Sequence, residues 1–431
     1  MKKYLVSKVM ACLALVGLTG CDGQKWSEQQ VDSFMLVTQK GGPSLGYSPE
    51  SGVKLLTVDG FAFKDLNRND SLDAYEDWRL SPQERAADLA SQLSIEEIAG
   101  LMLYSSHQAV PMIPTMGFGV SSYNGKNYEE SGAKPSDLSD DQKKFLADDH
   151  LRAVLVTRVE SPAVAAVWNN NMQAFVEGLD HGIPANTSSD PRHEAKATTE
   201  YNAGSGGQIS LWPTSLGLAA TFDPQLMYRF GEIASEEYRA LGIATALSPQ
   251  VDIATDPRWS RISGTFGEDP DLSTDMARAY CDAFQTTPET KGWGVKSVNA
   301  MVKHWYGYGA QEGGRDSHYA SGKYAVYPGN NLAMHKQSFV EGAFRLEGGT
   351  EMASAVMPIY SILWNQDPSG ENVGGSYSQW LIQQQLRDEA KFEGVICTDW
   401  GITQDMKVLD SPRGGKTSRS EERRVGKECR S

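Results

Sequence analysis

From about residue 150 onward, short apolar segments of β-strand type alternate with longer segments that have the spacing of an amphipathic helix. The pattern starts with an expected strand over residues 151–156 and an expected helix over residues 163–179, and it reaches a last strand over residues 395–399. Strands that alternate with helices predict a parallel sheet, because each strand returns to the same edge through a crossover. Two architectures satisfy this pattern, a closed barrel and an open doubly wound sheet.

The remaining expected elements continue the same alternation. Strands are expected at residues 183–186, 243–247, 300–305 and 353–360, and helices at residues 224–241, 276–284, 335–346 and 379–392.

Two observations favour the barrel. No Gly-x-Gly-x-x-Gly follows the first strand, as it does in most dinucleotide-binding open sheets. Polar residues suited to chemistry follow several different strands, and these are Asp190, Arg261, Lys303, His304 and Asp399. Sites of (β/α)8 barrels are assembled from many strand ends in this way. We therefore predict an α/β fold of the (β/α)8 TIM-barrel type, incomplete at its C-terminal end because the pattern lacks the last strand and helix.

The segment before the barrel has its own signals. Residues 22–60 show weak periodicity and many polar residues, and we interpret them as a tether and lead-in. Residues 61–80 hold a loop of the EF-hand type. Ser81-Pro82-Gln83-Glu84 is a capping box with proline at the first helical position, so it predicts the start of a helix and of the barrel domain, residues 81–409.

Residues 1–21 have the features of an export signal. Lys2 and Lys3 precede a short apolar run, which is too short to be a convincing membrane-spanning helix. The run ends in Leu18-Thr19-Gly20-Cys21, which resembles a bacterial lipobox with Cys21 as the acylated residue; an ordinary cleaved signal is the alternative. We expect an exported lipoprotein of the periplasm or cell envelope that meets the membrane only through its lipid anchor.

Net charge excludes one class of partner. The formal charge of −15 leaves nothing to neutralise a phosphate backbone, so we expect no nucleic acid as a partner. A neutral ligand such as a sugar is compatible. Of the five cysteines, only Cys281 and Cys397 lie outside the signal and the C-terminal tail, too few for a disulfide scaffold.

The C-terminal tail breaks the pattern. From Ser411 the sequence lacks strand and helix periodicity and becomes basic, with seven Lys or Arg residues against three Glu. We expect residues 410–431 to be a non-native scar on a truncated reading frame, with a native basic tail as the alternative.

Asp399 is the strongest single candidate for a catalytic residue. It stands where the buried segment Val395-Ile396-Cys397-Thr398 ends, and Trp400 and Gly401 follow it. A carboxylate in this place can attack an anomeric carbon, and an adjacent indole offers an apolar face for a sugar ring.

Five spaced motifs, in order, resemble the signatures of glycoside hydrolase family 3. They run from Gly182-Ile183-Pro184 through Asp190-Pro191-Arg192-His193, Asp256-Pro257-Arg258-Trp259-Ser260-Arg261 through Gly267-Glu268-Asp269-Pro270, Val302-Lys303-His304, Ala355-Val356-Met357-Pro358-Ile359-Tyr360, and Cys397-Thr398-Asp399-Trp400. The resemblance covers about residues 60–409.

The resemblance implies a retaining, exo-acting β-glucosidase that removes terminal β-D-glucosyl residues from a β-linked oligosaccharide or glucoside. In this reading Asp399 is the nucleophile of a covalent glycosyl-enzyme. The sugar of the −1 subsite would be held by Asp190, Arg261, Lys303, His304, Tyr360 and Trp400. No cofactor is expected for catalysis.

The general acid/base is the open point. Two-domain members of the family take a glutamate from a second domain, and no such domain follows Asp399 here. Asp316-Ser317-His318 resembles the Asp-x-His pair of the family's β-N-acetylglucosaminidases, which gives an alternative assignment. A non-catalytic carbohydrate-binding lipoprotein is the alternative from another functional class.

A separate motif predicts a structural calcium ion. Oxygen-bearing side chains recur with the spacing of a twelve-residue EF-hand loop, and they belong to Asp65, Asn67, Asn69, Ser71, Asp73 and Glu76. Asp70 replaces the usual glycine of the sixth position, and Asp tolerates the left-handed backbone better than most residues. A helix-capping turn rich in Asn and Asp is the alternative.

Overall fold

The computed structural model describes residues 23–117, 119–194, 208–319 and 322–402. The signal segment with Cys21, and the basic tail, lie outside these residues. The chain divides into two compact units, one of residues 1–94 with 174–183, and one of residues 95–173 with 184–431. No helix in the described part of the chain is both long enough and apolar enough to cross a membrane.

The N-terminal unit is built on two small antiparallel sheets. One has the order β1-β2-β3 and the other pairs β4 with β5. Their strands are β1 (Trp26–Val31), β2 (Phe34–Gln39), β3 (Leu45–Tyr47), β4 (Lys54–Val58) and β5 (Phe61–Asp65). The interpretation of residues 22–60 as a tether is therefore wrong for the described residues. The unit buries Val37 and Phe63, and Phe63 stacks on Trp78 with ring centroids 5.1 Å apart.

The predicted capping box at Ser81 is confirmed. α1 begins at Pro82, the Ser81 side chain accepts from the Glu84 backbone N–H, and the Glu84 carboxylate accepts from the Ser81 backbone N–H. α1 spans Pro82–Gln92.

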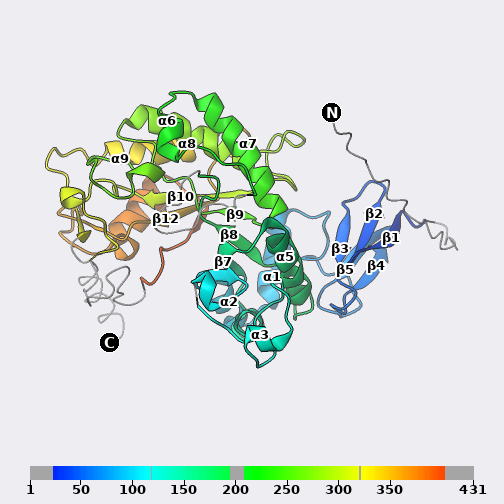
Figure 1. Ribbon diagram of the computed structural model, residues 1–431. Coiled ribbons are helices and arrows are strands. Elements are labelled where there is room, and N and C mark those ends of the chain that lie inside the picture. Colours follow the sequence, from blue (N-terminus) through cyan, green and yellow to red (C-terminus); the bar gives the residue numbers. More distant parts are fainter. Residues whose placement is uncertain (1–22, 118, 195–207, 320–321, 403–431) are drawn as a thin grey trace, which may run out of the picture. The chain divides into compact units, whose positions relative to one another are not determined.

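The second unit is centred on seven parallel strands in the order β14-β12-β10-β9-β8-β7-β6 (Figure 1). Neighbours in the sheet follow one another along the chain, as in a barrel. The strands are β6 (Gln108–Val110), β7 (Ala153–Val159), β8 (Asn186–Ser189), β9 (Thr245–Ala246), β10 (Asn299–Trp305), β12 (Ala355–Pro358) and β14 (Val395–Ile396). The short strands β11 (Tyr324–Ala325) and β13 (Ile362–Leu363) form a separate two-stranded sheet.

Helices separate the strands, and α7 and α8 pack against each other along the outside of the sheet (Figure 1). The α-helices of this unit are α2 (Ile95–Leu101), α3 (Tyr128–Ser131), α4 (Asp140–Ala147), α6 (Ser215–Ala219), α7 (Pro224–Ala240), α8 (Pro270–Gln285) and α9 (Met334–Gln337), while α5 (Pro162–Glu177) runs across both units. Two predicted helices are wound more widely over half or more of their length, as the π-helical segments η5 (Ser338–Ala343) and η7 (Trp380–Glu389). Short 3₁₀ turns occur at η1 (Pro114–Met116), η2 (Ile262–Gly264), η3 (Glu312–Gly314) and η6 (Gly375–Tyr377).

The ends of the sheet curl toward each other. The Trp400 indole, just after β14, donates to the Ser105 carbonyl at 3.3 Å, and its ring meets Tyr104 edge-on at 5.4 Å. Tyr104 and Ser105 precede β6, the strand at the other end of the sheet order. The first and last strands therefore come together as they do in a barrel, which resolves the choice between the two parallel architectures.

One strand lies three residues later than expected. The strand predicted over residues 183–186 forms instead at β8, residues 186–189. Pro184 has no N–H to give to a ladder, and the Gln173 side chain takes both backbone groups of Ala185, at 2.8 and 3.1 Å. Strand pairing therefore starts only at Asn186.

Candidate active site

The predicted site residues follow the ends of four different strands and one loop. Asp190 follows β8, and Lys303 and His304 lie near the end of β10. Tyr360 follows β12, and Asp399 and Trp400 follow β14. Arg261 lies directly before the 3₁₀ turn η2. The carboxyl ends of parallel strands meet at one edge of the sheet, so the fold gathers these side chains at that edge.

Asp190 and Lys303 form a buried ion pair. Lys303 Nζ lies 2.6 Å from Asp190 Oδ1, and the exposed fractions of the two side chains are 8% and 5%. The other carboxylate oxygen of Asp190 is buried and has no hydrogen-bond partner within the described residues. A buried acceptor without a donor is costly, so this oxygen is an unsatisfied acceptor next to the Lys303 charge.

A bulge in β10 explains how two adjacent residues both serve the site. Lys303 pairs with Met357 and Trp305 pairs with Pro358, so His304 is an extra residue on β10 at this point. A bulge changes the direction of a side chain that regular alternation would point away. The sequence places both residues at the strand end, but it does not reveal this bulge.

His304 lies between two carboxylates. Its Nδ1 lies 2.8 Å from Asp252 Oδ2, and its Nε2 lies 4.0 Å from Asp399 Oδ2. Asp399 is 7% exposed, and its Oδ1 accepts from the Trp400 backbone N–H at 2.7 Å. Burial raises the pKa of Asp252 to about 7, although the His304 backbone N–H and the Arg261 charge oppose that rise. The nucleophile candidate thus has an oriented imidazole beside it.

Arg261 is linked to His304 by contacts that both residues make with Tyr308. The Arg261 guanidinium lies 3.4 Å from the Tyr308 hydroxyl, and the Tyr308 ring packs against His304 with centroids 4.7 Å apart. Burial raises the pKa of Tyr308 well above its usual value, so its hydroxyl keeps its proton at neutral pH. Tyr308 follows β10 and was not predicted from the sequence, where it reads as one more aromatic of the core.

The Asp316 and His318 pair lies beside the same residues. His318 Nδ1 lies 2.5 Å from Asp316 Oδ1, and the Trp259 indole donates to Asp316 Oδ2 at 2.7 Å. The His318 ring meets Tyr360 edge-on at 5.1 Å. Burial by itself would raise the pKa of Asp316, but the hydrogen bond from His318 and the Arg261 charge hold it well below its usual range.

Tyr360 and Trp400 are in contact. The Tyr360 hydroxyl donates to the Trp400 backbone carbonyl at 2.8 Å, which links the loops after β12 and β14. The Trp400 ring also lies 5.8 Å from that of His107.

A glycine makes the loop after β10 fit. A Cβ on Gly309 would lie 2.0 Å from the carbonyl oxygen of Ile253. Only glycine allows this approach of two backbones, and it brings Tyr308 against the segment that carries Asp252.

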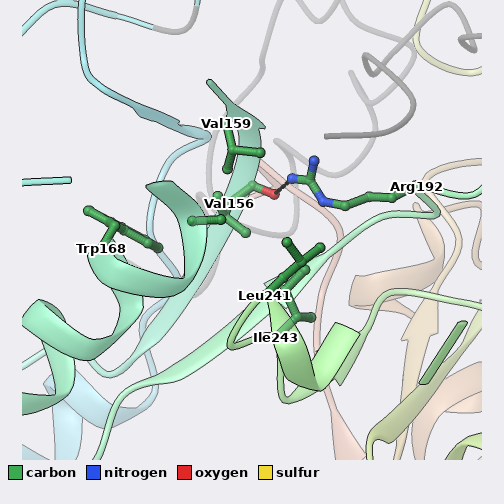
Figure 2. Close-up of a pocket in the computed structure, with 7 residues that line it drawn as sticks. Val156, Val159, Trp168, Arg192, Leu241 and Ile243 are labelled. Atoms are coloured by element: carbon green, nitrogen blue, oxygen red, sulfur yellow. Dashed lines mark hydrogen bonds between the residues drawn. The ribbon is translucent and has the colours of Figure 1, made fainter. Parts of the chain in front are cut away.

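Arg192 supports the base of the site. Its Nη2 donates to the carbonyls of Val156 and Thr157 at 2.9 and 3.0 Å, and its Nε donates to Ser189 Oγ at 2.8 Å. Figure 2 shows the guanidinium reaching Val156 beside an apolar pocket that has no room for a water molecule.

A larger cavity, of about 780 Å³, reaches the nucleophile candidate from inside the barrel unit. It is bounded at the strand starts by Arg152, Asn186, Thr245 and Asn299, and at its other end by Asp399 and Trp400. Most of the lining between them is apolar, so the cavity lacks the convergent polar groups of a sugar site.

The matches to known proteins identify the family of the chain. The glycosyl hydrolase family 3 N-terminal domain matches residues 122–420. The chain belongs to glycoside hydrolase family 3. It is 43% identical over 361 residues to the periplasmic β-glucosidase/β-xylosidase of Dickeya chrysanthemi, a match that covers 83% of this chain and 51% of the relative. Identity to β-glucosidase C of Emericella nidulans is 37% over 350 residues, covering 80% of this chain and 50% of the relative.

Solved structures give the same fold. A β-glucosidase of Erythrobacter marinus matches with a TM-score of 0.56 and 24% identity, covering 76% of this chain and 37% of that one. The Listeria innocua β-glucosidase with bound glucose matches with a TM-score of 0.53 and 24% identity, covering 75% and 38%. The family 3 chain spans about half the length of the curated relatives it matches.

The EF-hand-like loop has a left-handed backbone at its sixth position. Asp70 adopts a positive φ of 59° in place of glycine, and Asp65 accepts from the backbone N–H groups of Asn69 and Asp70. The Asn67 and Asn69 side-chain amides both donate to Asp73 Oδ2, at 2.5 and 2.8 Å. Calcium requires oxygen ligands, so these amides would have to turn their oxygens inward to bind it.

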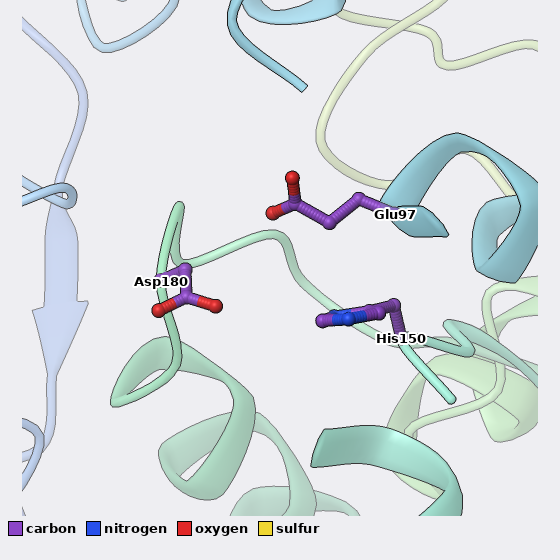
Figure 3. Close-up of side chains that lie close together, drawn as sticks. All are labelled: Glu97, His150 and Asp180. Carbon is purple, nitrogen blue, oxygen red and sulfur yellow. The ribbon is translucent and has the colours of Figure 1, made fainter. Parts of the chain in front are cut away.

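Figure 3 draws three other side chains that could ligate a metal. Glu97 on α2 and His150 before β7 belong to the barrel unit, whereas Asp180 belongs to the N-terminal unit. Because these residues are divided between two units, we assign no metal site to them.

Proposed function

We propose that the protein to which this chain belongs hydrolyses terminal β-D-glucosyl residues with retention, through a covalent glycosyl-enzyme on Asp399. The observation that carries the proposal is the position of Asp399 at the end of β14, with His304 Nε2 4.0 Å from its carboxylate. Relatives named as β-glucosidases, and one named as a β-glucosidase/β-xylosidase, support the substrate class.

The other residues have roles that follow from their chemistry. Asp190 offers one buried oxygen without a partner, Lys303 supplies a positive charge next to it, and Arg261 adds a second cation. A carboxylate accepts from sugar hydroxyls while cationic donors orient the others. Trp400 offers an aromatic face to the sugar ring.

A mechanism-based inhibitor tests the nucleophile. A 2-deoxy-2-fluoro-β-glucoside with a dinitrophenyl leaving group forms the covalent intermediate without needing a proton from an acid residue. We expect intact-protein mass spectrometry to show one added fluorosugar, on the peptide that contains Asp399. Asp399→Asn should remain unlabelled, and Asp282→Asn, a buried carboxylate on α8, should label like the wild type. Absence of label, or label on another residue, would overturn the proposal.

A second function is favoured by the His318 contact with Asp316. A carboxylate and an imidazole in hydrogen-bonding contact are a proton-transfer pair, so this chain would act as a β-N-acetylglucosaminidase with His318 as the acid/base. Turnover of an aryl N-acetylglucosaminide, lost in His318→Gln, would favour this function. Turnover of the aryl glucoside alone would reject it.

A third outcome remains testable with the same materials. If the chain binds glucose in calorimetry, yet no inhibitor labels it, then it is a carbohydrate-binding protein without catalysis.

We also propose that the protein is exported and anchored through a lipid on Cys21. Relatives named as periplasmic β-glucosidases support export. Radiolabelled palmitate should be incorporated by the wild type and not by Cys21→Ser. Equal incorporation by both would refute the anchor.

A further inference from the structure

Asp252 is a buried carboxylate that contacts His304 of the candidate site. It lies in the segment that follows β9, and none of its side-chain surface is exposed. Apolar residues flank it as Val251 and Ile253, both fully buried. A carboxylate in such surroundings requires partners that repay its loss of water.

Those partners come chiefly from one residue. Asp252 Oδ1 accepts from the His304 backbone N–H at 3.2 Å, and Asp252 Oδ2 lies 2.8 Å from His304 Nδ1. One carboxylate therefore holds both the backbone and the ring of the same residue. The ring can neither rotate about its side-chain bonds nor exchange its two nitrogens without breaking a contact.

This hold determines which nitrogen faces the nucleophile. When Nδ1 carries the proton that Asp252 accepts, Nε2 points toward Asp399, 4.0 Å from its Oδ2. That separation exceeds a hydrogen bond, so a sugar hydroxyl has room between the two groups and can donate to Nε2, which is an acceptor in this tautomer. The Tyr308 ring packs on the imidazole and keeps it in this plane.

We propose that Asp252 is a positioning residue of the glycosidase site, fixing the tautomer and direction of His304 so that Nε2 meets the sugar hydroxyl next to Asp399. The inference rests on the proposed function and adds a residue that never touches the substrate. Carboxylates that orient an imidazole in this way are known to matter for the group on its far side.

The other groups that face Asp252 do not provide the same hold. Arg261 acts on it by charge, and Gln250 and His335 of α9 are its other polar neighbours. Burial lowers the pKa of His335 to about 4, so it is neutral at neutral pH. The two nitrogens of His335 have no hydrogen-bond partner in the part of the chain that is described.

Asp252→Asn is the informative variant. Asparagine keeps the size of the side chain but offers one acceptor oxygen in place of two, and its NH2 group faces one of the two His304 N–H groups. One of the two contacts is therefore lost, with little change in packing. The matched control is Asp282→Asn, whose native carboxylate is also buried and accepts from the backbone N–H groups of Glu347 and Gly348, away from the site.

Two measurements separate positioning from folding. The first is the saturation of labelling by the dinitrophenyl fluoroglucoside at several pH values, with the melting temperature of each variant. We expect Asp252→Asn to lower the maximal labelling rate by about tenfold or more, with a smaller change in the half-saturating concentration and an altered pH profile. Asp282→Asn should lower the melting temperature and leave the labelling rate unchanged.

The second measurement needs no activity. The chain has seven histidines, so nitrogen-15 NMR of the ring nitrogens can be assigned by substituting His304 with Gln. At a pH above about 7, where Asp252 is ionised, we expect a protonated Nδ1 on His304 in the wild type and a mixture of tautomers in Asp252→Asn.

The outcomes are distinct. If the wild type is never labelled but shows the expected tautomer, the glycosidase proposal fails and the role of Asp252 in orienting His304 stands. If the wild type is labelled and Asp252→Asn labels at the same rate, the inference is overturned. An unprotonated Nδ1 in the wild type also overturns it.

Discussion

Replacing Asp190 with alanine tests whether its ion pair with Lys303 holds the centre of the site together. The two charged atoms lie 2.6 Å apart, and both side chains are more than nine-tenths buried. Removing one partner of such a pair leaves a buried charge without compensation, which costs about 3–5 kcal/mol. Because a domain has a free energy of unfolding of about 5–15 kcal/mol, this loss is a large share of the total.

The matched control is an exposed pair on α7. Arg229 Nη1 lies 3.2 Å from Glu232 Oε2, and the exposed fractions of the side chains are 64% and 42%. Such a pair contributes about 0–1 kcal/mol, so Glu232→Ala should shift the urea midpoint far less than Asp190→Ala. Urea unfolding followed by circular dichroism measures both.

The double variant Asp190→Ala with Lys303→Met completes the test. Removing both charges leaves no uncompensated ion, so its loss should be smaller than the sum of the single losses by at least about 1 kcal/mol. Strict additivity of the two single variants, or an effect of Asp190→Ala no larger than that of Glu232→Ala, would refute the reasoning.

Three further predictions concern other parts of the chain. Calcium should release heat on binding to metal-stripped protein and stabilise it by about 2.7 kcal/mol at 100 times its Kd. Glu76→Gln should abolish both effects. Absence of heat with millimolar Ca²⁺ would refute the calcium site. Burial raises the pKa of Glu194 to about 7, so the folded state keeps a proton that the unfolded state releases above about pH 4.3. The free energy of unfolding should therefore fall by on the order of 2–3 kcal/mol as pH rises from about 4.5 to 7. Glu194→Gln should flatten this slope in thermal melts, and an unchanged slope would contradict the prediction. Gly309→Ala should destabilise by about 1–3 kcal/mol because its Cβ meets the Ile253 carbonyl, whereas Gly329→Ala, with its nearest atom at 4.0 Å, should be neutral, and equal melting temperatures would count against the packing argument.

The outer helices and the order of strands were predictable because their signals are local. α7 begins after Asp223, whose side chain accepts from the first turn and which Pro224 follows, and its start was predicted. α8 has the same signal at Asp269-Pro270, but the expected start, residue 276, is six residues too late. Their apolar residues recur at helical spacing. The N-terminal strands were missed because four of the six residues of β1 are exposed, so no apolar run marks it.

The site was predictable only in part. Asp190, Lys303, His304 and Asp399 stand at strand ends, which a sequence reveals. Asp252 could not be predicted from the sequence, because its proposed role depends on two contacts with His304, a residue 52 positions away. The signal that was available is a charged residue between two apolar ones, and such a residue requires a buried partner.

The nucleophile candidate is held less firmly than the groups around it. β8 and β10 have a neighbour on each side of the sheet, whereas β14 pairs only with β12 among the described strands, over two residues. Beyond them, the Cys397 backbone N–H donates to the Val356 carbonyl, and the contacts of Trp400 fix the strand end. The free side of β14 faces the large cavity, and Val395 is 63% exposed there. Catalysis requires the attacking atom to be held within a fraction of an ångström. Under the proposed function, we therefore expect the rate of glycosyl-enzyme formation to depend on the support of β14 more than on that of Asp190 and Lys303, which belong to strand ends of β8 and β10.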